Sequence, residues 1–144
     1  MEKETIIKYL HGVGGLTLLI YAFYFGFSNG TLFLWETISR VINNQIDLPE
    51  TLLSLGPFVG FCLGVGNIVL SFGLIKRNIL TSISLSLVYV TLLIFVLGGF
   101  IGGIIGLLIV AGPISPALLI LSGLFFIVGI IWNISKRNAK VLSP

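Results

Sequence analysis

The sequence predicts an all-α integral membrane protein with four transmembrane helices, arranged as two helical hairpins. Of the 144 residues, 56% are hydrophobic and only 9% are charged, whereas charged residues make up about a quarter of a typical soluble domain. Residues 78–135 contain no Asp, Glu, Lys, Arg or His over 58 consecutive positions. One bilayer crossing takes roughly 20 apolar residues, so this stretch is long enough to cross twice. Residues 12–35 and 51–75 are also free of charge and supply two further spans.

Basic residues mark the ends of these segments and predict their orientation. Seven of the eight Lys and Arg residues fall on one side of the alternating spans: Lys3, Lys8, Lys76, Arg77, Lys136, Arg137 and Lys140. Only Arg40 falls on the other side. Because Lys and Arg accumulate on the cytoplasmic face of a membrane, we expect both termini in the cytoplasm and residues 28–49 outside. The predicted location is a cell membrane, with a prokaryotic plasma membrane as the first choice.

The first hairpin is expected to contain spans over residues 9–27 and 50–75, joined by an outer segment over residues 28–49. Apolar residues of the outer segment recur at helical spacing: Leu34, Ile38, Val41 and Ile42. This pattern, with charged and amide residues between, predicts a short helix that lies flat on the outer membrane surface. Residues 47–50, Asp-Leu-Pro-Glu, are typical of a helix start, since acidic residues and proline are favoured in the first turn.

The second hairpin is expected to contain spans over residues 79–110 and 116–135. Gly112-Pro113 predicts the end of the third helix, and Ser115-Pro116 predicts a capping residue followed by the first helical position of the fourth. A continuous helix over 79–110 would be about 48 Å long, so it would tilt or project beyond an average bilayer. The alternative is a break around residues 98–103, followed by a re-entrant piece.

Regular glycine spacing predicts helix-packing faces in two spans. Gly56, Gly60 and Gly64 recur at every fourth residue of the second span, and Gly98, Gly102 and Gly106 do the same in the third, beside a parallel pair, Gly99 and Gly103. In lipid there is little hydrophobic force between helices, so small residues that permit close backbone approach favour association. Two interpretations stay open: these faces contact another polypeptide, or they pack the two hairpins together.

The chain lacks the residues for a catalytic, metal or cofactor site of its own. His11 is the only histidine and Cys62 the only cysteine, so one chain cannot supply a complete ligand set of these residues. Outside the N-terminal tail the only acids are Glu36, Asp47 and Glu50, all in or beside the outer segment, whereas a proton-coupled carrier needs an ionisable group at membrane depth. We expect no enzyme activity from this chain by itself. A contact of His11 or Glu36 with a cofactor held by another subunit stays open.

These features predict a non-catalytic structural or accessory subunit of a larger membrane protein complex. The composition resembles that of small accessory subunits of respiratory and other energy-converting assemblies. The expected partners are the lipid bilayer and other membrane protein subunits, and no nucleic acid, because the basic residues do not cluster on one face. One alternative is a homo-oligomeric channel or small-solute carrier with a path lined by the hydroxyls of the third span and the glycine region near Gly98 to Gly106. A second is a lipid- or quinone-binding membrane protein that uses the aromatic residues Phe23, Phe25, Phe95, Phe125 and Phe126.

Overall fold

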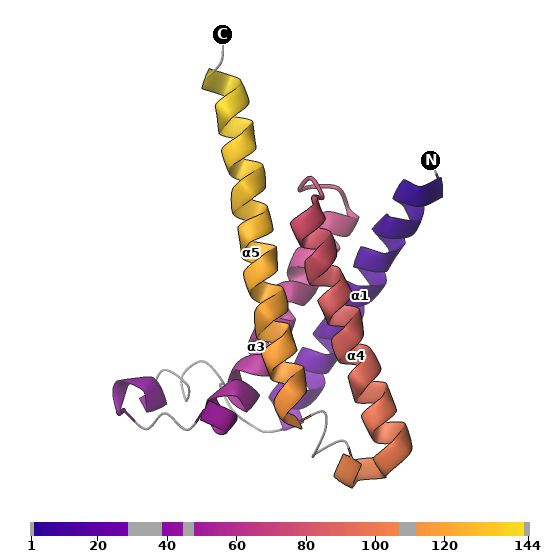
Figure 1. Cartoon of the computed structure of the whole chain (residues 1–144), viewed down its shortest axis with the longest axis vertical. Helices are drawn as coiled ribbons and strands as arrows, with labels where there is room; N and C mark the ends of the chain where they lie inside the picture. The colour runs from indigo at the N-terminus through magenta and orange to yellow at the C-terminus, as the bar shows by residue number, and fades with distance from the viewer. Residues whose placement is uncertain (1, 29–38, 45–47, 107–111, 143–144) are drawn as a thin grey trace.

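Long helices account for nearly all of the structure. The computed structural model describes residues 2–28, 39–44, 48–106 and 112–142. Four long helices, labelled as in Figure 1, are α1 (Glu2–Ser28), α3 (Leu48–Ser71), α4 (Ile79–Gly106) and α5 (Gly112–Leu142). A further helical stretch covers residues 39–42, and no strand occurs in the described ranges. The prediction of an all-α protein is confirmed for this part of the chain.

Three of the described helices are long and apolar enough to cross a membrane. The qualifying segments are Glu2–Tyr24, Ile79–Gly106 and Ile114–Val141. The apolar part of α3 is shorter, from Leu55 to Ser71. The structure therefore supports a protein with three long apolar helices that lie in a lipid bilayer. α3 is a shorter apolar helix beside them.

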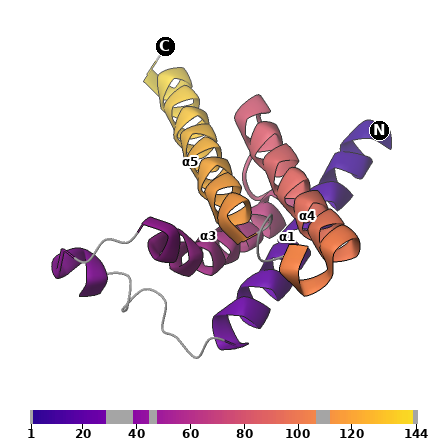
Figure 2. The same ribbon diagram turned by 60° about the horizontal axis from the view of Figure 1, so that its bottom comes forward.

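The helices pack as two antiparallel pairs. α1 lies against α3, α4 lies against α5, and further contacts join α3 to α5 (Figures 1 and 2). Each helix supplies one residue to a small buried cluster: Leu18, Leu63, Val88 and Leu119. Both termini and the turn between α3 and α4 lie at the same end of the bundle (Figure 1). This arrangement is the one that an even number of crossings would produce.

Several helix boundaries differ from the span boundaries that the sequence predicts, including the end of α5 at Leu142 rather than at residue 135. α1 begins at Glu2 rather than near Tyr9, and α3 ends at Ser71 rather than at residue 75. α5 begins at Gly112, so the expected helix stop at Gly112-Pro113 is wrong. A proline in the first turn replaces an N–H that has no helical partner, which is why Pro113 starts this helix and does not end a preceding one.

The predicted cap at Ser115 is also wrong, because Ser115 lies inside the first turns of α5. Pro116 follows it within the same helix. A residue with an N–H at position 116 would be among the first in α5 to donate to a carbonyl four residues earlier. Proline there therefore removes only one hydrogen bond, at the helix start. Ser115 is fully buried, and its hydroxyl has no hydrogen-bond partner among the residues that the structure describes.

α4 is not the continuous helix to residue 110 that the preferred interpretation predicts. At Gly103 the backbone has φ of 57° and ψ of −145°, a conformation that glycine adopts without the steric penalty of a side chain. The helix axis therefore breaks near its end, inside the region that the alternative interpretation assigned to a break. Residues 107–111 lie outside the described ranges, so the expected end at residue 110 and the re-entrant piece stay predictions.

The expected outer surface helix falls mostly outside the described ranges. Within 39–44 the chain forms one helical turn over residues 39–42, closed by a bond from the Asn43 N–H to the Ser39 carbonyl at 3.0 Å. Val41 and Ile42 are exposed there. The remainder of the predicted helix, including Glu36, is not described.

The turn between α3 and α4 is closed at both of its ends by specific hydrogen bonds. Gly73, with φ of 74°, follows the end of α3, and the Leu74 N–H donates to the Val69 carbonyl at 3.3 Å while the Gly73 N–H donates to the Leu70 carbonyl at 3.1 Å. These are the two bonds of a Schellman C-cap. The following helix is capped by Asn78, whose Oδ1 accepts the Thr81 N–H at 2.8 Å. The turn is thus a fixed connection rather than a loose one.

Side chains also connect this turn to the neighbouring helices. The Asn78 side-chain amide donates to the Gly129 carbonyl of α5 at 2.7 Å, and the Asn133 amide donates to the Lys76 carbonyl. On the other side, the Arg77 guanidinium donates to the Glu4 carbonyl of α1 at 3.3 Å. One end of the bundle is therefore held together through a single seven-residue connection, residues 72–78.

Candidate functional site

The glycines of α3 form a groove that the other helices of this chain fill. A Cβ built on Gly60 would lie 3.2 Å from the Tyr21 ring of α1, and one on Gly56 would lie 3.2 Å from Pro116 of α5. The Tyr21 ring also meets Phe95 of α4 edge to face, with centroids 5.8 Å apart. The groove therefore receives an aromatic side chain from the same chain.

The closest approach of α1 to α3 occurs where two glycines face each other. A Cβ on Gly15 would lie 2.7 Å from the Gly64 carbonyl oxygen, and a Cβ on Gly64 would lie 2.9 Å from the Gly15 carbonyl oxygen. Real Cβ atoms do not approach backbone atoms so closely. The crossing consequently needs glycine on both helices, as expected for helices that associate through close backbone packing in lipid.

The glycines of α4 have different surroundings. A Cβ on Gly102 or on Gly103 would meet nothing within 4 Å. Gly106 lies against the chain itself, since a Cβ there would be 2.8 Å from the carbonyl oxygen of Gly98. Residues eight apart in a regular helix are separated by about 12 Å, so this contact follows from the break at Gly103. Gly98 is buried and Gly99 is partly buried.

A buried polar pair joins α1 to α3 one turn from the glycine crossing. His11 Nδ1 lies 2.7 Å from Asn67 Oδ1, and both residues are fully buried. The Asn67 side-chain nitrogen donates to the Leu63 carbonyl at 2.8 Å, which leaves Oδ1 to accept from His11. A neutral His11 then has its proton on Nδ1 and a lone pair on Nε2. His11 Nε2 is buried and has no partner within the described part of the chain.

The sequence did not predict that His11 is buried. Its position near the end of an apolar span is typical of an interfacial histidine, and the partner that draws it inward, Asn67, lies 56 residues away. An amide one helix away at the same depth is the signal that could have identified the pair. Two polar side chains in apolar spans at matching distance from the same membrane face are candidates to satisfy each other.

Apart from the Ser115 hydroxyl, the other buried polar side chains of the described helices are also paired. The Ser122 hydroxyl donates to the Ser84 carbonyl at 3.0 Å, and the hydroxyl oxygens of Ser84 and Ser122 lie 2.9 Å apart. These bonds join α4 to α5. The Tyr89 hydroxyl donates to the Leu10 carbonyl at 2.6 Å and joins α4 to α1. Ser86 and Thr91 donate to carbonyls of their own helix. Hydroxyls that satisfy the backbone in this way hold helices together and do not present donors to a solute.

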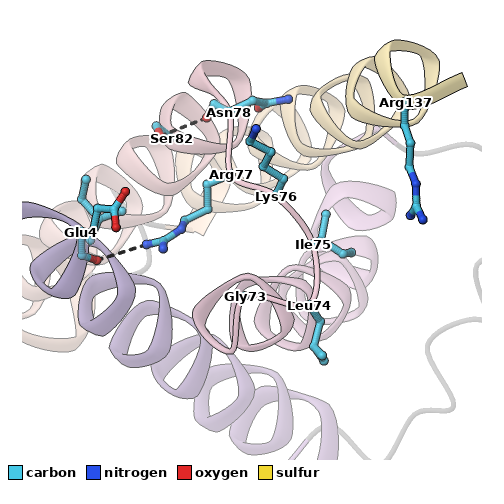
Figure 3. A pocket seen from close by; sticks show the side chains of 10 residues that line it. Glu4, Gly73, Leu74, Ile75, Lys76, Arg77, Asn78, Ser82 and Arg137 are labelled. Carbon is cyan, nitrogen blue, oxygen red and sulfur yellow. Dashed lines mark hydrogen bonds between the residues drawn. The ribbon is translucent and has the colours of Figure 1, made fainter. Parts of the chain in front are cut away.

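A basic pocket lies beside the turn between α3 and α4, at the end of the bundle that holds both termini (Figure 3). It has a volume of about 630 Å³, and its lining comes from α1, the turn, α4 and α5: Glu4, Ile7, Gly73, Leu74, Ile75, Lys76, Arg77, Asn78, Ser82 and Arg137. Three cations and one carboxylate give the lining a net positive charge. Arg77 reaches toward α1 and Arg137 projects from α5 on the opposite side of the turn (Figure 3).

The charges of this pocket are only partly used within the chain. Arg77 donates to the Glu4 backbone carbonyl, not to its carboxylate. Among the described residues, the side chains of Lys76 and Arg137 have no carboxylate partner within salt-bridge distance. By contrast, Lys136, next to Arg137, lies over the Trp132 ring at 5.3 Å. In the sequence these basic residues indicate only topology, because 60 positions separate Lys76 from Arg137 and hide that both line one pocket.

The described residues contain no group of three or more His, Cys, Asp or Glu side chains that could hold a metal ion. Cys62 is exposed on the surface of α3. Within the described ranges, the basic pocket and Gly102 and Gly103 of α4 are features that no other part of the described chain fills. Comparisons of the chain with protein-family models, curated proteins and solved structures find no match.

The glycine crossing predicts a strong effect of one added methyl group. Gly64→Ala should lower the stability of the purified protein by about 1–3 kcal/mol, because the Cβ would overlap the Gly15 carbonyl. Gly102→Ala is the matched control. It should be neutral or slightly stabilising, since its Cβ meets nothing and alanine favours a helix over glycine by about 1 kcal/mol. Thermal unfolding in a mild detergent measures both, and equal effects of the two variants would contradict the crossing.

The buried pair predicts a positive coupling between His11 and Asn67. Asn67→Leu should destabilise the protein, because it leaves the His11 N–H buried without an acceptor. His11→Leu in the same chain should recover part of the loss. Interhelical hydrogen bonds in membranes couple by about 0.6 kcal/mol on average and up to roughly 1.7, and a buried pair at 2.7 Å should lie in the upper part of that range. A double-mutant cycle from unfolding midpoints checks it, and additive effects would contradict the bond.

Proposed function

We propose that this chain is a four-span membrane protein with both termini in the cytoplasm that acts as a non-catalytic subunit of a larger membrane complex. The observation that supports the subunit role most directly is the end of α4. Among the described residues nothing covers Gly102 and Gly103, and neighbouring apolar side chains are almost fully exposed: Phe100 at 90%, Ile101 at 82% and Ile104 at 81%.

A small-residue face at membrane depth is suited to another helix. Lipid chains can cover exposed isoleucine and phenylalanine, but they gain little from a glycine groove, whereas a partner helix gains close backbone contact there. The glycines of α3 already have such a partner within the chain, in Tyr21 and Gly15. Those at Gly102 and Gly103 have none among the described residues, so a helix of another subunit is the proposed occupant.

A channel or carrier has less support. Its path would need polar groups that face a solute, yet the five serine and threonine hydroxyls of α4 are each hydrogen-bonded: Thr81, Ser82, Ser84, Ser86 and Thr91. Four of them bond to helix or cap carbonyls and Ser84 bonds to Ser122.

The orientation is supported by charge. Lys76, Arg77 and the basic C-terminal turns of α5 lie at the end of the bundle that also holds the N-terminus (Figure 1). Accumulation of Lys and Arg on the cytoplasmic face would place this whole end in the cytoplasm. α3 has a shorter apolar stretch than the other helices, so its crossing of the membrane is the part of this topology that labelling tests.

The subunit role predicts that the chain migrates with other polypeptides. After extraction of its native membrane in a mild detergent, it should run on a native gel well above the mass of a monomer or homo-oligomer, and partners should copurify. Gly102→Leu should release it from that complex without lowering its own unfolding temperature, because the added side chain enters open space. Cys62→Leu, at an exposed position of α3, is the control and should leave the complex intact. Migration of the unaltered chain only as a monomer or homo-oligomer would rule out the role.

The topology predicts a defined labelling pattern. In a Cys62→Ala background, single cysteines at Glu2, Leu74 and Asn138 should react with a membrane-impermeant maleimide only after the cytoplasmic side is opened. A cysteine at Asn43 should react in intact cells. All four positions are exposed, so access is limited by the membrane alone. Labelling of position 74 from the outside would show that α3 does not cross.

A further inference from the structure

We infer that the basic pocket beside the turn between α3 and α4 binds the phosphate of an anionic phospholipid headgroup. The first reason is its charge. Lys76 of the turn and Arg137 of α5 both line it and have no carboxylate partner in the described chain, and Arg77 adds a third cation (Figure 3). A phosphate oxygen pair matches the planar donors of an arginine, and lysine contributes a mobile point charge. Glu4 supplies one opposing carboxylate, so the net charge of the lining stays positive.

The second reason is the apolar rim, which indicates that the ligand is amphipathic. Ile7, Leu74 and Ile75 line the same pocket as the cations. Leu74 is 76% exposed, and the neighbouring Phe72 and Ile79 are 72% and 77% exposed. A free phosphate would make no favourable contact with these apolar side chains. A phospholipid would place its phosphate among the cations and the start of its acyl chains along the exposed apolar residues beside them, as in basic pockets between helices that hold lipid headgroups.

The third reason is that the pocket is formed before any ligand arrives. The turn is held by the C-cap at Gly73 and the N-cap at Asn78, and the Asn78 and Asn133 side chains tie it to α5. The Arg77 bond ties it to α1. Because these bonds already order the backbone, only the side-chain ends of Lys76 and Arg137 must become ordered on binding. The conformational entropy cost of binding is therefore small.

The inference is separate from the proposed subunit role. It concerns the opposite end of the bundle from Gly102, and a chain that binds lipid here could act alone or in a complex. A native gel without partner subunits would not contradict lipid binding in the pocket. An absence of lipid binding would not contradict a partner helix at Gly102.

Binding can be measured on the purified full chain in a nonionic detergent by native mass spectrometry. The protein is titrated with phosphatidylglycerol or with phosphatidylcholine of the same acyl chains. We expect one phosphatidylglycerol to bind at least about tenfold more tightly than phosphatidylcholine. In Lys76→Gln/Arg137→Gln the affinity for phosphatidylglycerol should fall about 30-fold, near the effect expected for two basic residues at an anionic headgroup. The single variants should lie between, and they serve as the test if the double variant does not fold.

The control removes the same charge at the same end of the protein. Lys3→Gln/Lys8→Gln lies on exposed positions of α1 outside the pocket lining and should change the affinity less than threefold. An equal loss in both double variants would overturn the proposal, because it would assign binding to overall charge. Equal affinity for phosphatidylglycerol and phosphatidylcholine would overturn it too. Displacement of the lipid by equimolar inorganic phosphate would identify free phosphate as the ligand and overturn the lipid assignment.

Discussion

The arrangement of this bundle depends on one constraint: within an apolar medium, each polar group must be satisfied by the protein itself. In water an unpaired hydroxyl or amide finds a solvent partner, but at membrane depth each unsatisfied group costs several kcal/mol. Apart from Ser115, the buried polar side chains of the described helices are accordingly paired, several of them across helix boundaries. His11 bonds to Asn67, Ser84 to Ser122, and Tyr89 to a carbonyl of α1. These bonds are what fix the rotation of one helix against the next, since the surrounding leucine and valine side chains can pack in many registers.

Close backbone approach and hydrogen bonding reinforce each other at the α1–α3 crossing. Gly15 and Gly64 bring the two backbones together, and His11 and Asn67 face each other one turn away. Each feature depends on the other. A larger residue at position 64 would move His11 and Asn67 apart, and without their hydrogen bond the register of Gly15 against Gly64 would not be fixed. The most specific contact of the structure is therefore built from the two kinds of interaction that remain effective in lipid, dispersion at short range and interhelical hydrogen bonds.

The general architecture could be predicted from the sequence because a bilayer restricts the choices. Charge-free segments predicted the helices, and the basic residues predicted that the termini and the Lys76-Arg77 turn share one end, as they do in Figure 1. The boundaries were less predictable, since proline is compatible with both the end and the beginning of a helix, and Pro113 proved to start one. The site was least predictable. Lys76 and Arg137 are both visible in the sequence, but their shared pocket depends on how α5 is tied to the turn by Asn78 and Asn133.

The two ends of the bundle are built differently, and this difference bears on what each can contact. At the end with the termini, caps and amide side chains fix the turn against two helices, and Lys76 and Arg137 line a pocket beside exposed apolar side chains. At the other end, α4 breaks at Gly103 and presents glycines without neighbours among the described residues. An ordered basic surface favours a small anionic ligand, because few groups must be immobilised on binding. An open glycine face favours a helix, because a partner helix gains close backbone contact where side chains are absent. The two surfaces therefore differ in the chemistry of their partners and not only in position, and a single ligand would not satisfy both.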